Sequence, residues 1–453
     1  MNGSFWRLYQ RQTHKSALAK DPIGEYSPPS SLFCNGMDLV QMQLSLTFLT
    51  PAFVGGATPR QADPYLPLRP SAVRGLLRTW FRMAVASLFW PAGNSQSQAD
   101  EFITILRKVE TECFGATDRR SPFSVSIDEA PPPQPVPAPT SPTSGLRYLG
   151  YGLFEKGTPT ALPVGKQYRL SLRIRPGIDR KQRAMLEKLL AATVWLWTHL
   201  GGMGARSRRG FGSMELLNGK VLGDDWKREL IEPCSDVTAL EIQQRTGLNA
   251  ALDVFEELLG IEFYANPDNG GPHRAIRNLL GLELTVLPTT FRNGQEALEY
   301  VGGLFQRFRS TRVRLTYKEP RLQDYFVVSN ALKTRTPPNQ PIGRTAFGLP
   351  LRFYFSSLQG ESCTIQPQRD KGDRVPSPLH IRIHRLANDR YAVMLLNLAA
   401  DPRTPPLLDL DNLEMKTRNG TYRVPLPDGA YLRDFVSFAV AQAGKTSGTG
   451  ARP

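Results

Sequence analysis

Residues 201–213 read Gly-Gly-Met-Gly-Ala-Arg-Ser-Arg-Arg-Gly-Phe-Gly-Ser, and their types and spacing point to chemistry. Glycine has no Cβ, so a phosphate group can approach its backbone amide closely. Arginine adds positive charge and a planar set of donors that matches phosphate. The loop follows a predicted helix and precedes a predicted strand. We therefore predict that it binds a polyanion; the alternative is a helix C-cap followed by a solvated basic turn.

Known phosphate and RNA motifs do not fit this loop. A Walker A loop would carry Gly-Lys-Ser/Thr after the glycines, and a dinucleotide fingerprint would place glycine at Ser207. Residues 209–212 copy the start of the RNP1 consensus, but Ser213 and Leu216 stand where its later aromatic residues should be. The loop therefore predicts anion binding, but it matches none of these nucleotide- or RNA-binding motifs in full.

A second basic feature lies on the helix predicted for residues 71–88, with Ser71 as its N-cap and with Trp80 and Phe81 directed into the core. Arginines recur there every four residues and so share one face, where like charges destabilise an isolated helix by ~0.2–0.5 kcal/mol per pair. Two interpretations stay open: a solvated face, or a stripe that a phosphate chain or an acidic partner neutralises. The three residues are Arg74, Arg78 and Arg82.

Composition limits the class of protein. The 453 residues include 56 Lys and Arg against 41 Asp and Glu, a net charge of +15, which favours nucleic acid or an acidic membrane surface as partner. No apolar run approaches the roughly 20 residues of a membrane-spanning helix, and the N-terminus lacks a signal-peptide core. We expect a cytoplasmic protein without a membrane partner. Free thiols are expected for the widely spaced cysteines Cys34, Cys113, Cys234 and Cys363.

Candidate catalytic groups are scattered. His380 and His384 share a predicted strand face, but no third ligand has convincing spacing, so we predict structural histidines. His199 precedes the loop and could stabilise the helix dipole or act as a general base on an RNA 2′-hydroxyl. Asp63 and Asp118 could serve a metal-dependent nuclease, although single loop aspartates usually form turns. We predict no catalytic residue, no metal and no cofactor.

The expected elements follow a recognisable order. The first half alternates as strand, helix, strand, strand, helix, strand, an order typical of a ferredoxin-like fold. Pro, Ser and Thr dominate residues 130–145, which predicts a mobile insertion. The predicted division is an N-terminal arm at 1–38, a first domain at 39–225, a second domain at 226–442 and a disordered tail at 443–453.

These segments resemble a known family. Thr50-Pro51, Gly55-Gly56, the run from Leu68 to Arg82 and the loop at 201–213 are similar to the RAMP superfamily. Within it the likeness is to the family of first subunits of Cmr effector complexes, the type III-B CRISPR systems. In the second half, Ala346 to Pro350 and Ser377 to Leu379 fit the same family. The resemblance extends from about residue 40 to residue 400.

The resemblance implies an α+β protein with two ferredoxin-like (RAMP/RRM-like) domains in tandem, interrupted by irregular insertions. It implies guide RNA as ligand and a place in a multi-subunit complex, at the end that holds the 3′ part of the guide. We predict a non-catalytic RNA-binding subunit that holds guide RNA, paired target RNA or both in antiviral defence. The alternatives are an endonuclease that processes the guide RNA precursor without metal, and a scaffold for acidic neighbours. The predicted RNA-binding residues are Arg69, Arg74, Arg78, Arg82, Gly202, Gly204, Arg206, Arg208, Arg209, Arg344 and Arg374.

Overall fold

The computed structural model describes most of the chain after residue 40. The predicted N-terminal arm, together with His14, Cys34 and His273, lies outside the described residues. None of the described helices has the length and apolar content to cross a membrane. The described residues are 41–88, 96–155, 157–223, 226, 228–259, 279, 281–309, 324–368, 374–400, 406–407 and 410–448.

The first half folds around a four-stranded sheet in the order β2-β5-β1-β6, with every neighbouring pair antiparallel. Its inner face is apolar at alternate positions such as Leu44, Leu46 and Leu170, as the period-two pattern predicts. The order strand, helix, strand, strand, helix, strand expected for the first domain is present, with insertions. The strands are β1 (Gln41–Phe48), β2 (Phe123–Glu129), β5 (Gln167–Ile174) and β6 (Met214–Leu216).

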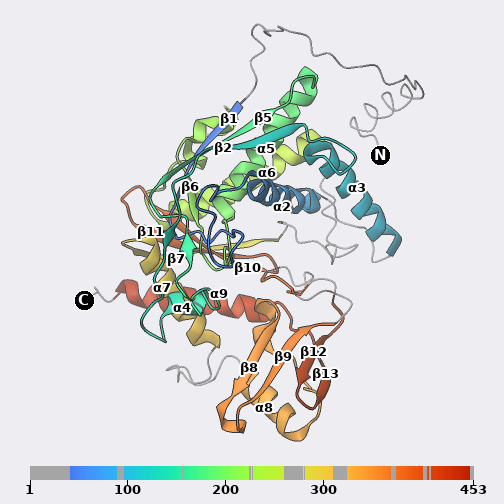
Figure 1. Ribbon diagram of the computed structural model, residues 1–453, viewed down its shortest axis with the longest axis vertical. Coiled ribbons are helices and arrows are strands. Elements are labelled where there is room, and N and C mark those ends of the chain that lie inside the picture. Colours follow the sequence, from blue (N-terminus) through green and yellow to red (C-terminus); the bar gives the residue numbers. More distant parts are fainter. Residues whose placement is uncertain are drawn as a thin grey trace.

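Helices pack against this sheet and against one another (Figure 1). Trp80 and Phe81 are buried in the shared core, as predicted. Asp179 caps its helix by accepting the N–H groups of Lys181 and Gln182. Ser71 does not cap the first helix, which begins one residue earlier at a proline whose fixed φ suits the first helical position. The helices are α2 (Pro70–Leu88), α3 (Gln96–Phe114), α5 (Arg180–Leu200) and α6 (Val237–Leu259). Two 3₁₀ turns, η1 (Gly219–Leu222) and η2 (Arg228–Leu230), lie between α5 and α6 in the chain.

The second half does not form one domain equivalent to the first. A three-stranded antiparallel sheet, β10-β11-β7, has both faces buried: Met394 and Leu396 face the first core, whereas Val393 and Leu395 face a second core. The chain from residue 443, predicted as disordered, continues a helix to Gly448, because Phe438, Ala439 and Ala443 pack into that second core. The elements are β7 (Glu283–Phe291), α7 (Gly294–Arg309), β10 (Leu379–Arg385), β11 (Tyr391–Asn397) and α9 (Ala430–Gly448).

A second antiparallel sheet of the latter half, β13-β12-β9-β8, forms a separate lobe with its own core (Figure 1, lower part). Helix α8 packs on its inner face through Val328 and Leu332. The expectation of two tandem ferredoxin-like domains is thus met only as a mixed fold of several small antiparallel sheets. The elements are α8 (Asp324–Thr334), η3 (Gly343–Phe347), β8 (Leu351–Phe355), η4 (Ser356–Leu358), β9 (Glu361–Pro367), β12 (Leu413–Thr417) and β13 (Gly420–Val424).

The Pro-rich segment 130–145, predicted to be mobile, is attached at both ends. Strand β3 (Gln134–Pro135) pairs with β4 (Thr160–Ala161). Helix α4 (Gly145–Leu149) packs on α7, where Glu299 accepts the N–H groups of Gly145 (2.7 Å) and Leu146 (3.0 Å). The insertion therefore connects the first half to the second.

Candidate nucleic-acid interface

The loop 201–213 lies where the two halves meet. Its own backbone closes with Met203 N–H donating to the Gly212 carbonyl at 3.0 Å. On one side, Ala205 N–H donates to the carbonyl of Phe53, beside the first sheet. On the other side, the carbonyl of Arg208 accepts the N–H of Ile381 on β10 at 3.0 Å. The loop thus covers the edge strand β10 of the sheet β10-β11-β7 and continues into β6 of the sheet in the first half.

The glycines of this loop serve close backbone packing. Gly212 has φ +63°, and a Cβ there would lie 1.9 Å from the carbonyl oxygen of Met203. Gly204 has φ +88°, and its Cβ would lie 2.6 Å from the carbonyl oxygen of Phe53. At Gly202 the nearest atom would be the Cβ of Ser207, at 3.2 Å. The sequence argument that glycine admits a phosphate is therefore corrected at Gly204 and Gly212, because protein backbone occupies the space.

The three loop arginines have different surroundings. Arg208 donates through Nη1 to the carbonyl of Ser377 at 2.9 Å, and Arg209 through Nη2 to the carbonyl of Phe347 at 2.9 Å. Arg206 donates to the carbonyl of Tyr151, yet its side chain stays exposed. The alternative interpretation of a solvated basic turn is wrong for Arg208 and Arg209, because the second half of the chain packs over them.

Arg209 belongs to a group of neighbouring arginines, two of which lie over one aromatic ring. Its guanidinium carbon lies 4.5 Å from the ring centroid of Phe305, and that of Arg309 lies 4.9 Å from the same centroid. Arg209 Nη1 and Arg309 Nε are buried without a hydrogen-bond partner in the described part of the chain. Burial, with the charge of Arg309 next in size, lowers the pKa of Arg209. We call Arg209, Arg309 and Arg344 the arginine cluster.

A buried carboxylate, that of Asp324, faces this cluster. Asp324 is buried and accepts the N–H groups of Gly343 and Arg344, each at 2.8 Å, at the start of η3. Oδ2 of Asp324 lies 3.5 Å from Nε of Arg344. Burial lowers the pKa of Arg344, with Arg309 contributing in the same direction. Within the described residues this is the only ion pair of the cluster, so its positive charge is only partly balanced.

Arg374 and Arg206 approach each other at the surface beside the loop. Both side chains are exposed. Burial of part of Arg206, followed by the charge of Arg374, lowers the pKa of Arg206, whereas the smaller effects of Tyr151 and Glu155 act in the opposite direction. Two exposed arginines that repel each other form a site that an anion would stabilise, because a shared phosphate relieves the repulsion.

A groove of about 310 Å³ opens next to the loop, between it and the start of α2. Arg69 lies at its wall and donates to the carbonyl of Gly55. The rest of the wall is small or apolar, so an extended chain could lie against it. The lining residues are Val54, Gly55, Pro67, Arg69, Ala72, Gly75, Leu76, Thr79, Met203 and Gly204.

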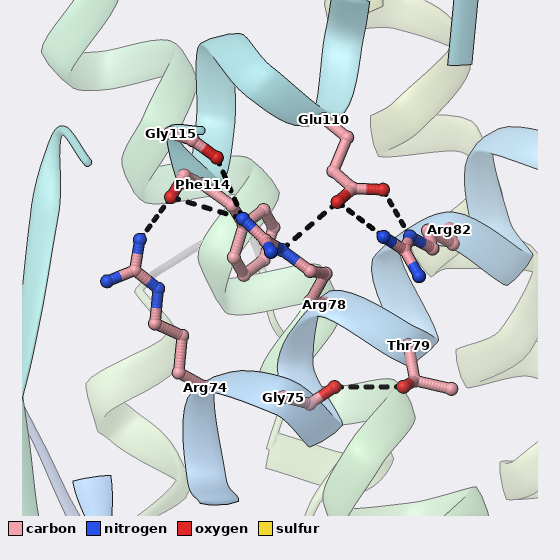
Figure 2. Close-up of polar contacts among 8 residues, drawn as sticks. All are labelled: Arg74, Gly75, Arg78, Thr79, Arg82, Glu110, Phe114 and Gly115. Carbon is pink, nitrogen blue, oxygen red and sulfur yellow. Dashed lines mark hydrogen bonds and ion pairs between the residues drawn. The ribbon is translucent and has the colours of Figure 1, made fainter. Parts of the chain in front are cut away.

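The arginine stripe of α2 has partners within the protein. Figure 2 shows its three side chains directed at the end of α3. Arg74 donates to the carbonyl of Phe114, and Arg78 donates to that of Gly115 at 2.8 Å. These are carbonyl groups that a helix C-terminus leaves free, and cations there also favour the helix dipole. Arg82 forms a two-point ion pair with Glu110.

Glu110 also lies 3.1 Å from Arg78 Nε and is itself buried. Arg74, Arg78 and Arg82 were predicted to bind RNA; the structure shows that several of their donors hold α3 against α2, and RNA contact by these residues stays a prediction. The sequence could not show this, because Glu110 lies 28 residues from Arg82 and only the packed helices bring them together.

Two of the candidate catalytic residues, His199 and Asp63, are inaccessible or structural. His199 is buried, and its imidazole stacks on Trp195 with 4.6 Å between ring centroids. Burial lowers its pKa to about 3. Asp63 forms a turn by accepting the N–H groups of Tyr65 and Leu66. The imidazole of His199 therefore does not face the exposed side of the loop.

His380 and His384 are buried on one face of β10, with Arg382 between them. Arg382 donates to the carbonyl groups of Thr198 and His199 at the end of α5. In the part of the chain that the structure describes, no three His, Cys, Asp or Glu side chains converge as metal ligands would. This face of the sheet joins the two halves of the molecule.

Two features of the interface were not anticipated. Arg309 joins the arginine cluster; the basic end of the helix at 294–309 was the signal available for it. Tyr65, four positions before Arg69, and Tyr151, whose carbonyl accepts Arg206, are both exposed, and a lone tyrosine carries no such signal in the sequence. Of the predicted residues, the structure brings Arg206 to Arg374, Arg209 to Arg344 through Arg309, and Arg69 to Gly204.

Comparison with known proteins agrees with the motifs. Residues 45–215 match the RAMP superfamily. The CRISPR system Cmr subunit Cmr1-1 of Pyrococcus furiosus is 26% identical over 204 residues, which are 44% of this chain and 53% of that protein. The chain thus spans about half the length of this curated relative. The likeness to the RAMP superfamily and to first Cmr subunits is confirmed.

A solved structure has the same fold. The apo crystal structure of Cmr1 from Pyrococcus furiosus matches with a TM-score of 0.53 and 17% identity, covering 89% of this chain and 96% of that one. A chain of a type III-B Cmr-beta complex bound to cognate target RNA and AMPPnP matches with a TM-score of 0.49 and 12% identity, covering 89% and 99%. The superposition with Cmr1 establishes the fold along nearly the whole of that chain.

Proposed function

From a chain that carries a RAMP-superfamily domain at residues 45–215, we propose a non-catalytic RNA-binding subunit of a type III-B CRISPR effector complex. Its ligand is guide RNA, through the 3′ part, or the target RNA paired with it. Its partners are the other subunits of the complex. The observation that carries the proposal is the pair of exposed arginines, Arg206 and Arg374, beside the groove that Arg69 lines.

Phosphate contacts explain this arrangement. Arg206 and Arg69 each give one donor to a backbone carbonyl, and a guanidinium has five N–H donors, so further donors are available to a ligand. An arginine whose side chain is already fixed by such a hydrogen bond loses less conformational entropy on binding phosphate than a freely rotating one. The partly balanced charge of the arginine cluster lies behind the same loop and adds to the field there.

The two halves support a RAMP architecture of two related units. The sheet β10-β11-β7 repeats the order of β2-β5-β1, if β7, β10 and β11 are equated with β1, β2 and β5. Helices α7 and α9 then correspond to α2 and α5. We infer two ferredoxin-like units, of which the second has three strands in the described residues.

The subunit would hold RNA without cleaving it. General acid–base cleavage needs a titratable group within reach of the 2′-hydroxyl. His199, the candidate base nearest the loop, is buried against Trp195 with a pKa of about 3. Incubation with labelled guide precursor and target RNA, with and without magnesium, should leave both intact. Cleavage that disappears in His199→Ala would instead favour the processing endonuclease.

RNA binding is tested by anisotropy with a labelled single-stranded RNA over a range of salt concentrations. Each neutralised phosphate of a single strand contributes about −0.7 to the slope of log K against log salt, so three arginine contacts predict a slope near −2. Arg69→Gln should make the slope less steep by about 0.7. Arg292 is an exposed arginine paired with Glu296. Arg292→Gln therefore removes the same charge outside the groove and should leave the salt slope unchanged. Binding independent of salt would contradict the proposal.

A further inference from the structure

Two tyrosines stand out on the surface around the groove. The side chain of Tyr65 is 95% exposed and that of Tyr151 is 66% exposed. Tyr65 precedes Pro67 and Arg69, which line the groove, and Tyr151 provides the carbonyl that Arg206 binds. Tyr151 is therefore in contact with an arginine of the interface through its backbone, and Tyr65 lies four positions before one along the chain.

The backbone around Tyr65 is fixed although its ring is free. Asp63 Oδ1 accepts the N–H groups of Tyr65 (2.9 Å) and Leu66 (3.0 Å), which forms the turn that presents the ring. Ala62, the residue before Asp63, donates its N–H to Thr160 Oγ1 at 2.7 Å and is thereby anchored to β4. A ring held outward in this way loses little entropy when it stacks on a ligand.

Tyr151 is held from the other side. It follows α4, whose first N–H groups bind Glu299 of α7. Its carbonyl accepts the Arg206 guanidinium, and the glycine after it, Gly152, has φ +84°. Arg206 itself follows Gly204, a lining residue of the groove, by two positions.

Resting on the function proposed above, we propose that Tyr65 and Tyr151 stack on unpaired bases of the bound RNA while Arg69 and Arg206 hold the neighbouring phosphates. Aromatic stacking beside a basic groove is how single-stranded nucleic acid is bound without regard to sequence. Bases within a duplex already stack on one another and offer no free face. The interface therefore selects a single-stranded stretch, whatever its sequence. The basic flanks of both rings favour RNA over an apolar protein surface as the occupant.

Three RNA probes of equal length test the stacking: single-stranded oligo-A, the same ribose-phosphate chain without bases, and a duplex. With the full chain at fixed salt, oligo-A should bind at least tenfold more tightly than the abasic probe. Tyr65→Ala and Tyr151→Ala should each weaken oligo-A binding by about 5- to 150-fold, the value of one stacked base. Neither change should weaken abasic RNA more than about twofold.

Matched variants separate stacking from other causes. Tyr65→Phe and Tyr151→Phe keep the ring and should bind oligo-A like the parent protein. Tyr354→Ala removes a ring that is 69% exposed in the separate lobe and should have no effect. Arg206→Gln should weaken oligo-A and abasic RNA by the same factor, since it acts on phosphate.

The outcomes distinguish the two proposals. If the tyrosine variants bind oligo-A normally while Arg206→Gln does not, the stacking inference is overturned and the RNA-binding function stands; the rings would then be free to meet a neighbouring protein. If the tyrosine variants weaken abasic RNA as much as oligo-A, stacking is again excluded. If the parent protein binds none of the probes at low salt, the proposed function itself fails.

Discussion

Helix α2 and the loop 201–213 both carry three closely spaced arginines, but their charges are balanced in different ways. On α2, Glu110 and the carbonyl groups at the end of α3 occupy the guanidinium groups (Figure 2). At the loop, Arg206 stays exposed next to Arg374, with the charge of Glu155 acting more weakly on it, and Arg209 lies against Arg309 near the carboxylate of Asp324. An arginine pattern therefore indicates a ligand only where the fold leaves its charge unbalanced.

The strongest test of this difference removes two charges from each region. Arg206→Gln with Arg374→Gln should weaken RNA binding by ~3–6 kcal/mol, about 10²- to 10⁴-fold, because each charge-assisted contact contributes ~1.5–3 kcal/mol. Arg74→Gln with Arg82→Gln removes the same net charge and should change the affinity less than about tenfold. Anisotropy at one salt concentration measures both. Equal losses would mean that net charge, and not position, controls binding.

The second test concerns stability. Glu110→Ala leaves Arg78 and Arg82 without their carboxylate and should lower the free energy of unfolding by ~1–3 kcal/mol; both arginines are partly exposed, which limits the loss. Glu112→Ala, on the same helix, breaks an exposed pair with Arg119 and should cost ~0–1 kcal/mol.

Urea unfolding gives both values, and RNA affinity should not fall in either variant. A Glu110→Ala protein of normal stability and altered RNA affinity would return the α2 stripe to the interface.

The third test measures how stability depends on pH through His199, which is buried where the two halves meet behind the loop. The folded protein keeps His199 neutral with a pKa of about 3, whereas the unfolded chain takes up the proton near pH 6.5. Its contribution to stability is therefore complete above pH 6.5 and is lost as the pH falls below that value. Between pH 7 and pH 5 the loss should be about 2 kcal/mol.

Denaturation at both pH values measures this loss, and His199→Gln should reduce it. Hydrogen exchange should quicken around the loop before it does on α2. A stability profile that is flat from pH 7 to pH 5 would show that His199 is not held neutral.

The smallest expected effect is at Gly75, on the exposed face of α2. A Cβ there meets nothing within 4 Å, so Gly75→Ala should raise the free energy of unfolding by ~0.5–1 kcal/mol through helix propensity. Thermal denaturation measures the gain. The groove lies beside this residue, so a simultaneous loss of RNA affinity would extend the interface onto α2.

Much of the first half was predictable from sequence. Period-two alternation located β1 and β5, helical periodicity placed Trp80 and Phe81 in the core, and Asp179 marked the start of α5. These signals are local, because each depends on residues a few positions apart. The motifs around the loop were also enough to indicate the RAMP superfamily.

The roles of individual arginines depended on the tertiary structure. Arg82 meets a carboxylate from another helix, Arg209 is covered by residues more than a hundred positions away, and Arg206 stays exposed. The sequence by itself determined the main elements of the first half, the positive charge and the likeness to the RAMP superfamily. Only packing decided which positive charges are neutralised internally and which remain for a ligand, because a guanidinium's partners are set by proximity in space and not by spacing along the chain.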